Sequence, residues 1–500
     1  MRNNIFLFIN TITFLLSCPL LAQVENTISR NVEIDQNIPD HELKEAINTE
    51  FIIHQGIPDH LIDIKAKGGV VTLEGAVDNT ISSSLAEFIA LQVRGVEAVI
   101  NSIEVEPMPV DDEEIAYRVR ELLLIDPAAE AYEVDVSVVN GVVQLSGEVD
   151  SYQEKKIADR ITSSVAGVKK VNNQLNYDFE AVRPAEEIKK DVEDALEWDT
   201  MIDDEKIQVT VTRGVVDLNG EVASAYEKEL AKTQAWVSGV NQVDAEDLSV
   251  AKVKRNTTFI GDKYRTRSDE EIRVAIRQKF LNNARLNAFN PEIAVTEGRV
   301  KLKGAVKSLK AKLKAEQIVR NTVGVEYFKN FLKVRLNGQP TDDKIGQNVM
   351  KAILWDPVLE RHELNASVYN GKVYLKGTVD NNYEKRHAIE VVARIKGVQD
   401  VENNLMIDGR VPDYKQTNLD LSSSTVEEVN GKTDVELMKE VNNQLWWSPF
   451  VNEDDVVVSV EQGVVRLKGE VDTRREKSAA IDNAIDAGAV DVIDEIVVLK

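Results

Sequence analysis

The chain has 500 residues, of which 43% are hydrophobic and 29% are charged. This balance is typical of soluble globular domains and excludes a disordered chain or a protein built from several membrane spans. The formal net charge of −25 predicts a protein that is repelled on average by anionic surfaces.

The first residues predict a bacterial export signal over 1–22. Arg2 precedes an apolar stretch at 5–16 that is too short to span a bilayer comfortably, and small residues follow up to Ala22. We favour ordinary cleavage after Ala22, because a proline directly follows Cys18, and we expect a periplasmic protein with an N-terminal segment at 23–39. The alternative is lipoprotein processing, which would leave Cys18 lipidated and the chain anchored to a membrane.

Cys18 is the only cysteine of the chain. After ordinary cleavage the mature protein therefore contains no thiol. This excludes disulfides, thiol nucleophiles and cysteine-ligated metals.

One order of elements recurs along the chain and is clearest at 111–178. A helix is expected to begin at Asp111, with Glu114 completing a capping box, and to end before Pro127. Valines then alternate with polar residues on both sides of Asn140-Gly141, which predicts a β-hairpin with a type I′ turn. A second helix and a final strand at 173–177 complete the order α-β-β-α-β.

Matching caps support the same reading in other repeats. For the first helix, capping boxes are expected at Ser268/Glu271 and Thr433/Glu436. For the second helix, an oxygen-bearing side chain precedes a glutamate by three residues at Ser151/Glu154, Ser224/Glu227, Asn381/Glu384 and Thr473/Glu476.

Three glycines mark every repeat. The first is expected in the hairpin turn, the second lies six residues later in the outgoing strand where another element approaches closely, and the third caps the second helix. These structural glycines are Gly69, Gly75, Gly95, Gly141, Gly147, Gly167, Gly214, Gly220, Gly239, Gly298, Gly304, Gly324, Gly371, Gly377, Gly397, Gly463, Gly469 and Gly488.

The spacing predicts an α+β fold made of six small units in tandem, each with two helices packed on one face of a three-stranded mixed sheet. The units are expected at 40–107, 111–178, 183–250, 268–337, 341–408 and 433–500. A basic linker at 251–267 precedes the fourth unit. A flexible linker at 409–432, which contains a proline and a run of serines, precedes the sixth.

These residues resemble the BON domain family. The resemblance lies in the hairpin 138–147, in Tyr152-Gln153-Glu154-Lys155, in Val165-Ala166-Gly167-Val168, and in Leu354-Trp355-Asp356-Pro357 of the fifth unit. It covers six units and implies the α-β-β-α-β fold. It also implies a phospholipid-binding module of the kind found in osmotically inducible periplasmic proteins. The matching positions build a scaffold rather than a site.

No pattern of catalytic, cofactor-binding or metal-binding residues stands out. The histidines His41, His54, His60, His362 and His387 occupy no repeated position, and no phosphate-binding glycine loop or nucleophile motif occurs. We therefore expect no enzyme, no cofactor and no metal.

Tryptophan occupies one position at the end of the first helix in three units, at Trp198, Trp355 and Trp447, where the second unit has Ile125. The simpler interpretation is that each fills the gap between helix and sheet, because isoleucine can replace it. The alternative is an aromatic anchor at a lipid interface. Trp446, next to Trp447, is the better candidate for such an exposed contact.

Positive charge is concentrated around the fourth unit. Residues 251–336 contain 21 lysines and arginines and 8 acidic residues, a net charge of +13 in an acidic chain. The candidate contacts for anionic lipid are Arg299, Lys301 and Lys303 on the outgoing strand, and Lys307, Lys310, Lys312 and Lys314 on the second helix. A solvated face that balances acidic neighbours is the alternative. Nucleic acid is disfavoured, because few aromatic residues lie nearby.

Two functions follow from the sequence. The first is an exported, non-enzymatic protein that binds phospholipid or another envelope surface through its fourth unit and protects the envelope under osmotic stress; the stress role rests on the resemblance alone. The second is an assembly scaffold that binds other envelope proteins or its own copies, with the basic unit paired to acidic units.

Overall fold

The computed structural model describes residues 38–54, 56–129, 133–177, 183–251, 267–287, 289–336, 338–407, 432–471 and 473–498. The expected export signal, Cys18, nearly all of the segment 23–39 and almost all of both linkers lie outside the described residues. Within the described part of the chain, no helix is both long enough and apolar enough to cross a membrane.

Each of the six units contains two helices. The first helices are α2 (Asp40–His54), α4 (Asp112–Ile125), α6 (Ala185–Glu197), α8 (Asp269–Leu281), α10 (Asp342–Leu354) and α12 (Asp434–Trp447). The second helices are α3 (Thr80–Leu91), α5 (Tyr152–Ser163), α7 (Ala225–Gln234), α9 (Leu309–Arg320), α11 (Asn382–Ala393) and α13 (Arg474–Asp486).

Each unit also contains a hairpin and a returning strand. The hairpins are β1 (Ile62–Lys67) with β2 (Val70–Val77), β4 (Glu133–Val139) with β5 (Val142–Val149), β8 (Ile207–Thr212) with β9 (Val215–Val222), β12 (Glu292–Thr296) with β13 (Arg299–Val306), β15 (Asn365–Tyr369) with β16 (Lys372–Val379), and β18 (Val456–Glu461) with β19 (Val464–Val471). The returning strands are β3 (Ala98–Val105), β14 (Tyr327–Val334), β17 (Asp400–Ile407) and β20 (Asp491–Val498), together with the interrupted pairs β6 (Lys170–Asn173) and β7 (Asn176–Tyr177), and β10 (Gln242–Asp244) and β11 (Leu248–Val250).

The outgoing hairpin strand is the centre of every sheet. It pairs antiparallel with the first strand and parallel with the returning strand, as β2 does between β1 and β3. A parallel return needs a crossover, which the second helix provides. The predicted mixed sheet and the α+β fold are therefore confirmed.

Alternate residues of the central strand build the core of each unit. In the second unit Val143 and Leu145 are fully buried, as is Val119 of α4. The cores of the first, third and sixth units are separate clusters, whereas those of the second, fourth and fifth units merge into one. Units two, four and five are thus packed together more closely than the rest.

The second glycine of each repeat allows the close approach that its position predicts. At Gly147 an added Cβ would lie 2.0 Å from the Glu133 carbonyl oxygen, and φ is +123°. At Gly377 the corresponding distance to the Glu363 oxygen is 2.7 Å, and φ is +138°. A side chain at these positions meets both a clash and backbone strain.

The start of the first helix in the second unit differs from the prediction. Ser268 and Thr433 form the expected capping boxes in units four and six, but Asp111 makes no side-chain cap. Instead its neighbour Asp112 accepts hydrogen bonds from the backbone N–H groups of Asn140 and Gly141.

This contact between helix start and hairpin turn recurs in five units. An aspartate at the start of the first helix accepts from the N–H of a turn residue through Asp40, Asp112, Asp269, Asp342 and Asp434. Each aspartate lies 29 residues before the hairpin glycine. The sequence carried this signal, but capping explained the aspartates equally well.

The units associate in three pairs: one with six, two with five, and three with four. In each pair, the backbone N–H just before the third glycine of one unit donates to the carbonyl that closes the first helix of the other. These bonds are Arg94 N to Trp447 O at 3.0 Å, Ala166 N to Trp355 O at 2.8 Å, Lys396 N to Ile125 O at 2.8 Å and Val323 N to Trp198 O at 3.2 Å.

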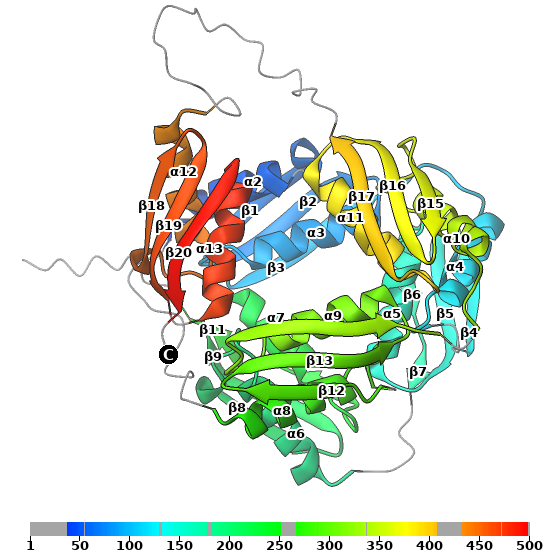
Figure 1. Ribbon diagram of the computed structural model, residues 1–500, viewed down its shortest axis with the longest axis horizontal. Helices are drawn as coiled ribbons and strands as arrows, with labels where there is room; N and C mark the ends of the chain where they lie inside the picture. The colour runs from blue at the N-terminus through cyan, green and yellow to red at the C-terminus, as the bar shows by residue number, and fades with distance from the viewer. Residues whose placement is uncertain are drawn as a thin grey trace, which may run out of the picture.

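Further contacts join the three pairs into a closed ring in the order one, six, three, four, two, five (Figure 1). Tyr226 of unit three packs edge-on against Phe450 of unit six at 5.1 Å between ring centroids. Arg285 of unit four forms two 2.8 Å hydrogen bonds to Asp126 of unit two. The Tyr383 ring of unit five lies against Gly56 of unit one. The second helices lie on the inner side of the ring.

Replacing Gly377 by alanine is expected to destabilise the fifth unit by about 3 kcal/mol, because the new Cβ meets a backbone oxygen at a positive φ. Gly346 in helix α10 of the same unit is the matched control. Its added Cβ would meet only ordinary contacts, and alanine there is expected to stabilise by about 0.5–1 kcal/mol. Urea denaturation followed by circular dichroism measures both. Equal effects of the two variants would contradict this account of the second glycine.

Arg94 is the key polar residue between units one and six. Its guanidinium, 3% exposed, donates to the carbonyls of Ser448 and Val451 and pairs with Glu453. Arg94→Met is expected to leave these groups buried without partners and to cost about 3 kcal/mol. Hydrogen exchange should then rise across α12 and α13 and leave α10 unchanged. Uniform protection in the variant would show that other contacts hold this pair.

Candidate functional site

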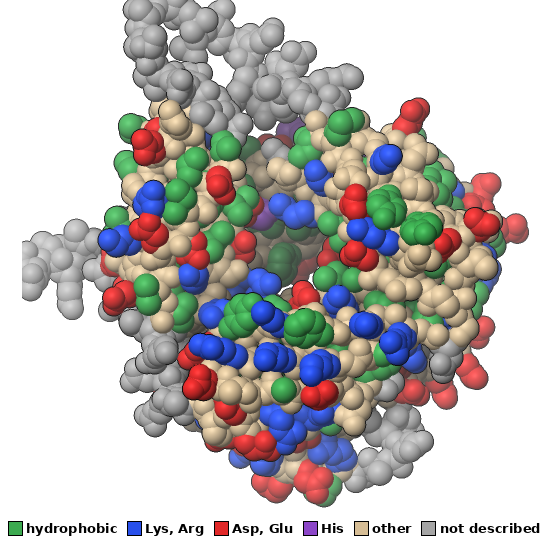
Figure 2. Space-filling view, viewed as in Figure 1, with side chains coloured by type: hydrophobic (Ala, Val, Ile, Leu, Met, Phe, Trp, Pro, Cys, Tyr) green, Lys and Arg blue, Asp and Glu red, His purple; other side chains and the backbone are tan. Residues whose placement is uncertain are grey.

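The outer face of the sheet in unit four combines basic and aromatic side chains. Arg299, Lys301 and Lys303 of β13 are exposed on one face, as expected for alternate residues of a strand. On the neighbouring strand β14 the exposed residues are Tyr327, Lys329, Phe331 and Lys333. Register places Arg299 opposite Tyr327 and Lys301 opposite Lys329. We call these seven residues the outer basic face; Figure 2 shows the basic side chains gathered over β13.

The equivalent face of the fifth unit carries acidic residues where unit four has basic and aromatic ones. At the positions of Tyr327, Lys329 and Phe331, strand β17 has Asp400, Glu402 and Asn404. There Lys372 pairs with Glu402 at 2.8 Å, so its charge is neutralised within the sheet. In unit four the one ion pair on this face that the structure describes is weak, with Lys303 3.9 Å from an exposed Glu292. The outer basic face therefore keeps a net positive charge.

The four lysines predicted on the second helix of unit four do not form one surface. Lys307 is exposed and lies over the Phe289 ring, and Lys312 is partly exposed. Lys310 instead turns inward and forms an ion pair with Glu390 of unit five. Lys314 also faces the inside of the ring and donates to Gln317. The prediction that all four lysines lie on the helix is wrong for Lys307, which precedes the N-cap Ser308. Lys310 and Lys314 lie on the helix but point away from the strand residues.

The tryptophans at the end of the first helix lie between units rather than only between helix and sheet. Trp355 packs edge-on against Tyr117 of unit two, with ring centroids 5.8 Å apart, and Trp447 packs against the core of unit one. Trp446 is half-buried beneath the Arg94 guanidinium. Arg267, the described end of the basic linker, stacks on Trp198 and pairs with Glu197 at 2.8 Å.

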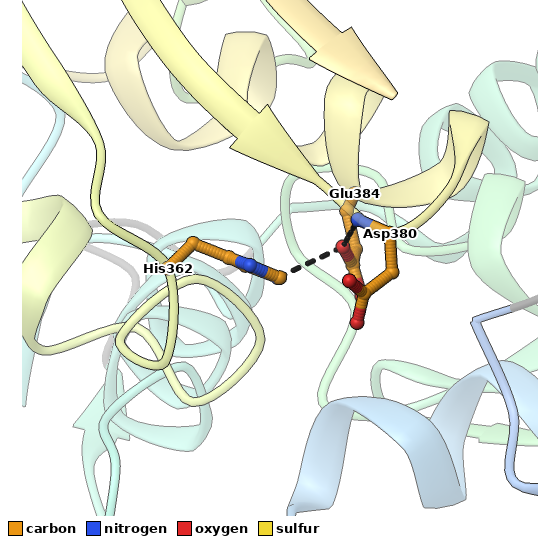
Figure 3. A group of neighbouring side chains, drawn as sticks. All are labelled: His362, Asp380 and Glu384. Carbon is orange, nitrogen blue, oxygen red and sulfur yellow. Dashed lines mark hydrogen bonds and ion pairs between the residues drawn. The ribbon is translucent and has the colours of Figure 1, made fainter. Parts of the chain in front are cut away.

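One group of side chains has the composition of a metal site. His362, Asp380 and Glu384 bring ligand atoms within 4.8 Å of one another (Figure 3). His362 Nε2 lies 2.9 Å from a Glu384 oxygen. The Arg361 guanidinium pairs with Glu384 and lies 3.4 Å from Asp380, so a cation already neutralises these carboxylates.

Glu384 itself has a structural role shared by other units. Its carboxylate accepts from the backbone N–H of Asp380 at the start of α11. The equivalent glutamates are also buried and accept from backbone N–H groups, at Glu154, Glu227 and Glu476. The repetition assigns this group to helix capping, and we derive no metal chemistry from it.

A cavity of about 490 Å³ lies where units one, five and six meet. Its lining includes Glu50, His54, Arg386, Asp482 and Asp486. Burial raises the pKa of Glu50 to about 7, and nearby acidic groups add to the rise although Gln444 opposes it. Burial likewise raises the pKa of Asp482 and of Asp486. These carboxyls lie where burial makes a negative charge unfavourable.

The other histidines are unremarkable in placement. His387 lies 2.9 Å from a buried Asp356 oxygen, and His54 lies 3.7 Å from Glu50. His60 is exposed beside Asp59, and His41 is exposed. No two of the five belong to one ligand set within the described residues.

Repeated small α-β-β-α-β modules, with recurrent structural residues and no shared catalytic set among the described residues, define a tandem-domain protein rather than a single-pocket one. The BON domain model matches residues 39–107, 111–178, 184–252, 268–335, 341–409 and 433–500. The chain belongs to the BON domain family.

Curated relatives cover parts of the chain. It is 30% identical over 143 residues to osmotically-inducible protein Y of Escherichia coli, covering 27% of this chain and 71% of that protein. It is 33% identical over 127 residues to outer membrane lipoprotein DolP of Haemophilus influenzae, covering 23% of this chain and 65% of that protein. A solved structure of CdsD, a structural protein of the type III secretion system of Chlamydia trachomatis, is 16% identical, with a TM-score of 0.12, over 42% of this chain and 94% of that one.

Glu50→Gln is expected to change how stability depends on pH. Because the folded pKa is about 7 and the ordinary value is 4.5, the folded state binds more protons between these values. The wild type should therefore lose stability as the pH rises through this window, by about 3 kcal/mol from Glu50. The amide carries no charge, so the variant should lack this loss. Urea denaturation at pH 4.5 and pH 8 measures it.

Glu45→Gln is the control, since Glu45 lies on the same helix and is exposed. It should keep the wild-type profile. A Glu50→Gln profile that matches that of the wild type would show that Glu50 is not the group that titrates.

Proposed function

We propose that this chain is an exported, non-enzymatic BON-repeat protein that binds anionic phospholipid at the surface of an envelope membrane. The contact is the outer basic face of unit four. The single observation that carries the proposal is the presence of five cations and two exposed aromatic rings on adjacent strands, in a protein whose net charge is −25.

The basic face attracts an anionic bilayer at short range, whereas the net negative charge of the whole protein repels it at long range. Each basic residue near an anionic bilayer contributes roughly 1 kcal/mol, and the attraction decays within about one Debye length, ~8 Å at physiological salt. Tyr327 and Phe331 are 46% and 53% exposed, and aromatic rings favour the headgroup region. The molecule should therefore dock in one orientation, with unit four toward the lipid.

An envelope location is supported by the expected export signal and by a relative named an outer membrane lipoprotein. A role under osmotic stress is supported by the name of the other relative, osmotically-inducible protein Y. The lipid contact does not depend on whether Cys18 is removed or lipidated, because the outer basic face lies far along the chain, in the fourth unit.

Vesicle flotation tests the lipid contact. Lys301→Glu/Lys329→Glu/Lys333→Glu reverses three charges on the outer basic face. Binding to anionic vesicles should fall by roughly 100-fold, since three residues each contribute about 1 kcal/mol. Wild-type binding should require anionic lipid and should weaken with salt.

The matched control is Lys344→Glu/Lys376→Glu/Lys439→Glu, which changes the net charge equally at exposed positions of units five and six. It should bind nearly as the wild type does. If both triple variants lose binding equally, net charge rather than the outer basic face governs attachment. If neither loses it, the proposal fails.

The assembly scaffold is the second function to test. Its basic unit was expected to pair with acidic units of another copy, but within one chain it already pairs with acidic residues of other units. Arg285 of the basic unit binds Asp126 of unit two, and Lys279 lies 3.5 Å from Asp199 of unit three. Light scattering with and without vesicles separates the two functions. A monomer that binds lipid supports the first, and a salt-sensitive oligomer indifferent to lipid supports the second.

A further inference from the structure

Five cations gather on the inner side of the ring, where units two, four and five meet. They are Arg160 of α5, Arg285 after α8, Lys310 and Lys314 of α9, and Arg394 at the end of α11; we call them the central cationic cluster. Figure 2 shows that the centre of the ring is hollowed and that basic side chains reach its rim. The cluster is distinct from the outer basic face, which lies on the opposite side of the unit-four sheet.

The carboxylates around the cluster neutralise only part of its charge. Arg285 binds Asp126 through two hydrogen bonds, and Lys310 pairs with Glu390. Asp356 lies 2.9 Å from His387 but 3.9 Å from the nearest Arg394 nitrogen. Two of the five cations therefore have a close carboxylate partner.

The remaining three cations have N–H donors that lack a carboxylate acceptor. Arg394 Nη1 donates to Ser164 Oγ, but its buried Nη2 makes no hydrogen bond. Lys314 binds the uncharged Gln317. In the part of the chain that the structure describes, the Arg160 guanidinium makes no hydrogen bond and no ion pair; Asp126 and Asp159 are its acidic neighbours.

Burial and, after it, mutual repulsion disfavour the charged forms of the lysines in the cluster. Burial, together with Arg285, Arg160, Arg394 and Lys314, lowers the pKa of Lys310 to about 7. Burial also lowers the pKa of Lys314 to about 8; Arg160, Lys279 and Arg285 add to this effect and Asp199 opposes it. Cations that are partly withdrawn from water beside one another cost free energy unless an anion compensates them.

We propose that the central cationic cluster binds a multiply charged oxyanion of the phosphate class. Guanidinium groups offer two parallel N–H donors to such an oxyanion, and ammonium groups add point charges. Three units contribute donors, which suits a tetrahedral group with several acceptor oxygens. The bound anion would hold units two, four and five together where their cores already merge.

A bilayer is not the source of this anion, because the second helices that carry the cluster line the inside of the ring. The proposal is thus independent of the lipid contact. Either can fail while the other holds.

Isothermal titration calorimetry with inorganic phosphate and with pyrophosphate tests the proposal on the full-length mature chain at pH 7.0 and constant ionic strength. Pyrophosphate should bind more tightly than phosphate, and chloride should give no heat. Arg160→Gln and Lys314→Gln should each weaken pyrophosphate binding at least about tenfold, the loss expected for one charge-assisted contact. Both variants remove repulsion, so each should melt at or above the wild-type temperature without ligand.

Lys303→Gln on the outer basic face is the matched control and should bind pyrophosphate as the wild type does. Flotation of Lys314→Gln with anionic vesicles should also match that of the wild type. Wild-type titrations without heat or a pyrophosphate-dependent melting shift would overturn the proposal. Unchanged affinity in both Arg160→Gln and Lys314→Gln would overturn it as well.

Discussion

One backbone hydrogen bond organises the molecule above the level of the single unit. The carbonyl that closes a first helix cannot bond within its own helix, and it accepts the N–H that precedes the third glycine of a partner unit. The glycine itself has a positive φ, which turns the chain directly after that N–H. Backbone groups that would otherwise need water thus satisfy each other between units. Between units two and five, Trp355 also packs against Tyr117.

The local fold could be predicted because its determinants are close in sequence. The glycine beside Asn140 and the alternating valines around it specify a hairpin within ten residues, and the caps at Ser268 and Thr433 specify helix starts. The ring could not be predicted, because its contacts join distant residues: Arg94 and Ser448 are 354 positions apart. The shared tryptophan position was a usable sign of a common interface, but core filling explained it equally well.

The same limit explains the division of the basic unit. Spacing alone predicted Lys307, Lys310 and Lys314 on one helix face, but Lys307 precedes α9. Spacing also could not say which neighbour the face of Lys310 and Lys314 meets. In the ring the face meets α11, so Lys310 finds Glu390 and Lys314 lies near Arg160. Strand residues such as Lys301 remain outside because the helices cover only one side of the sheet. The basic residues are thus divided between the central cationic cluster and the outer basic face.

The nested order of the pairs has a consequence for folding. Units three and four are neighbours in sequence, units two and five are further apart, and units one and six are separated by most of the chain. Loop closure costs more entropy as the separation grows, so the innermost pair closes most readily and each closure shortens the loop for the next. Assembly should proceed outward from the middle of the chain. The first unit, although synthesised earliest, should be the last to find its partner.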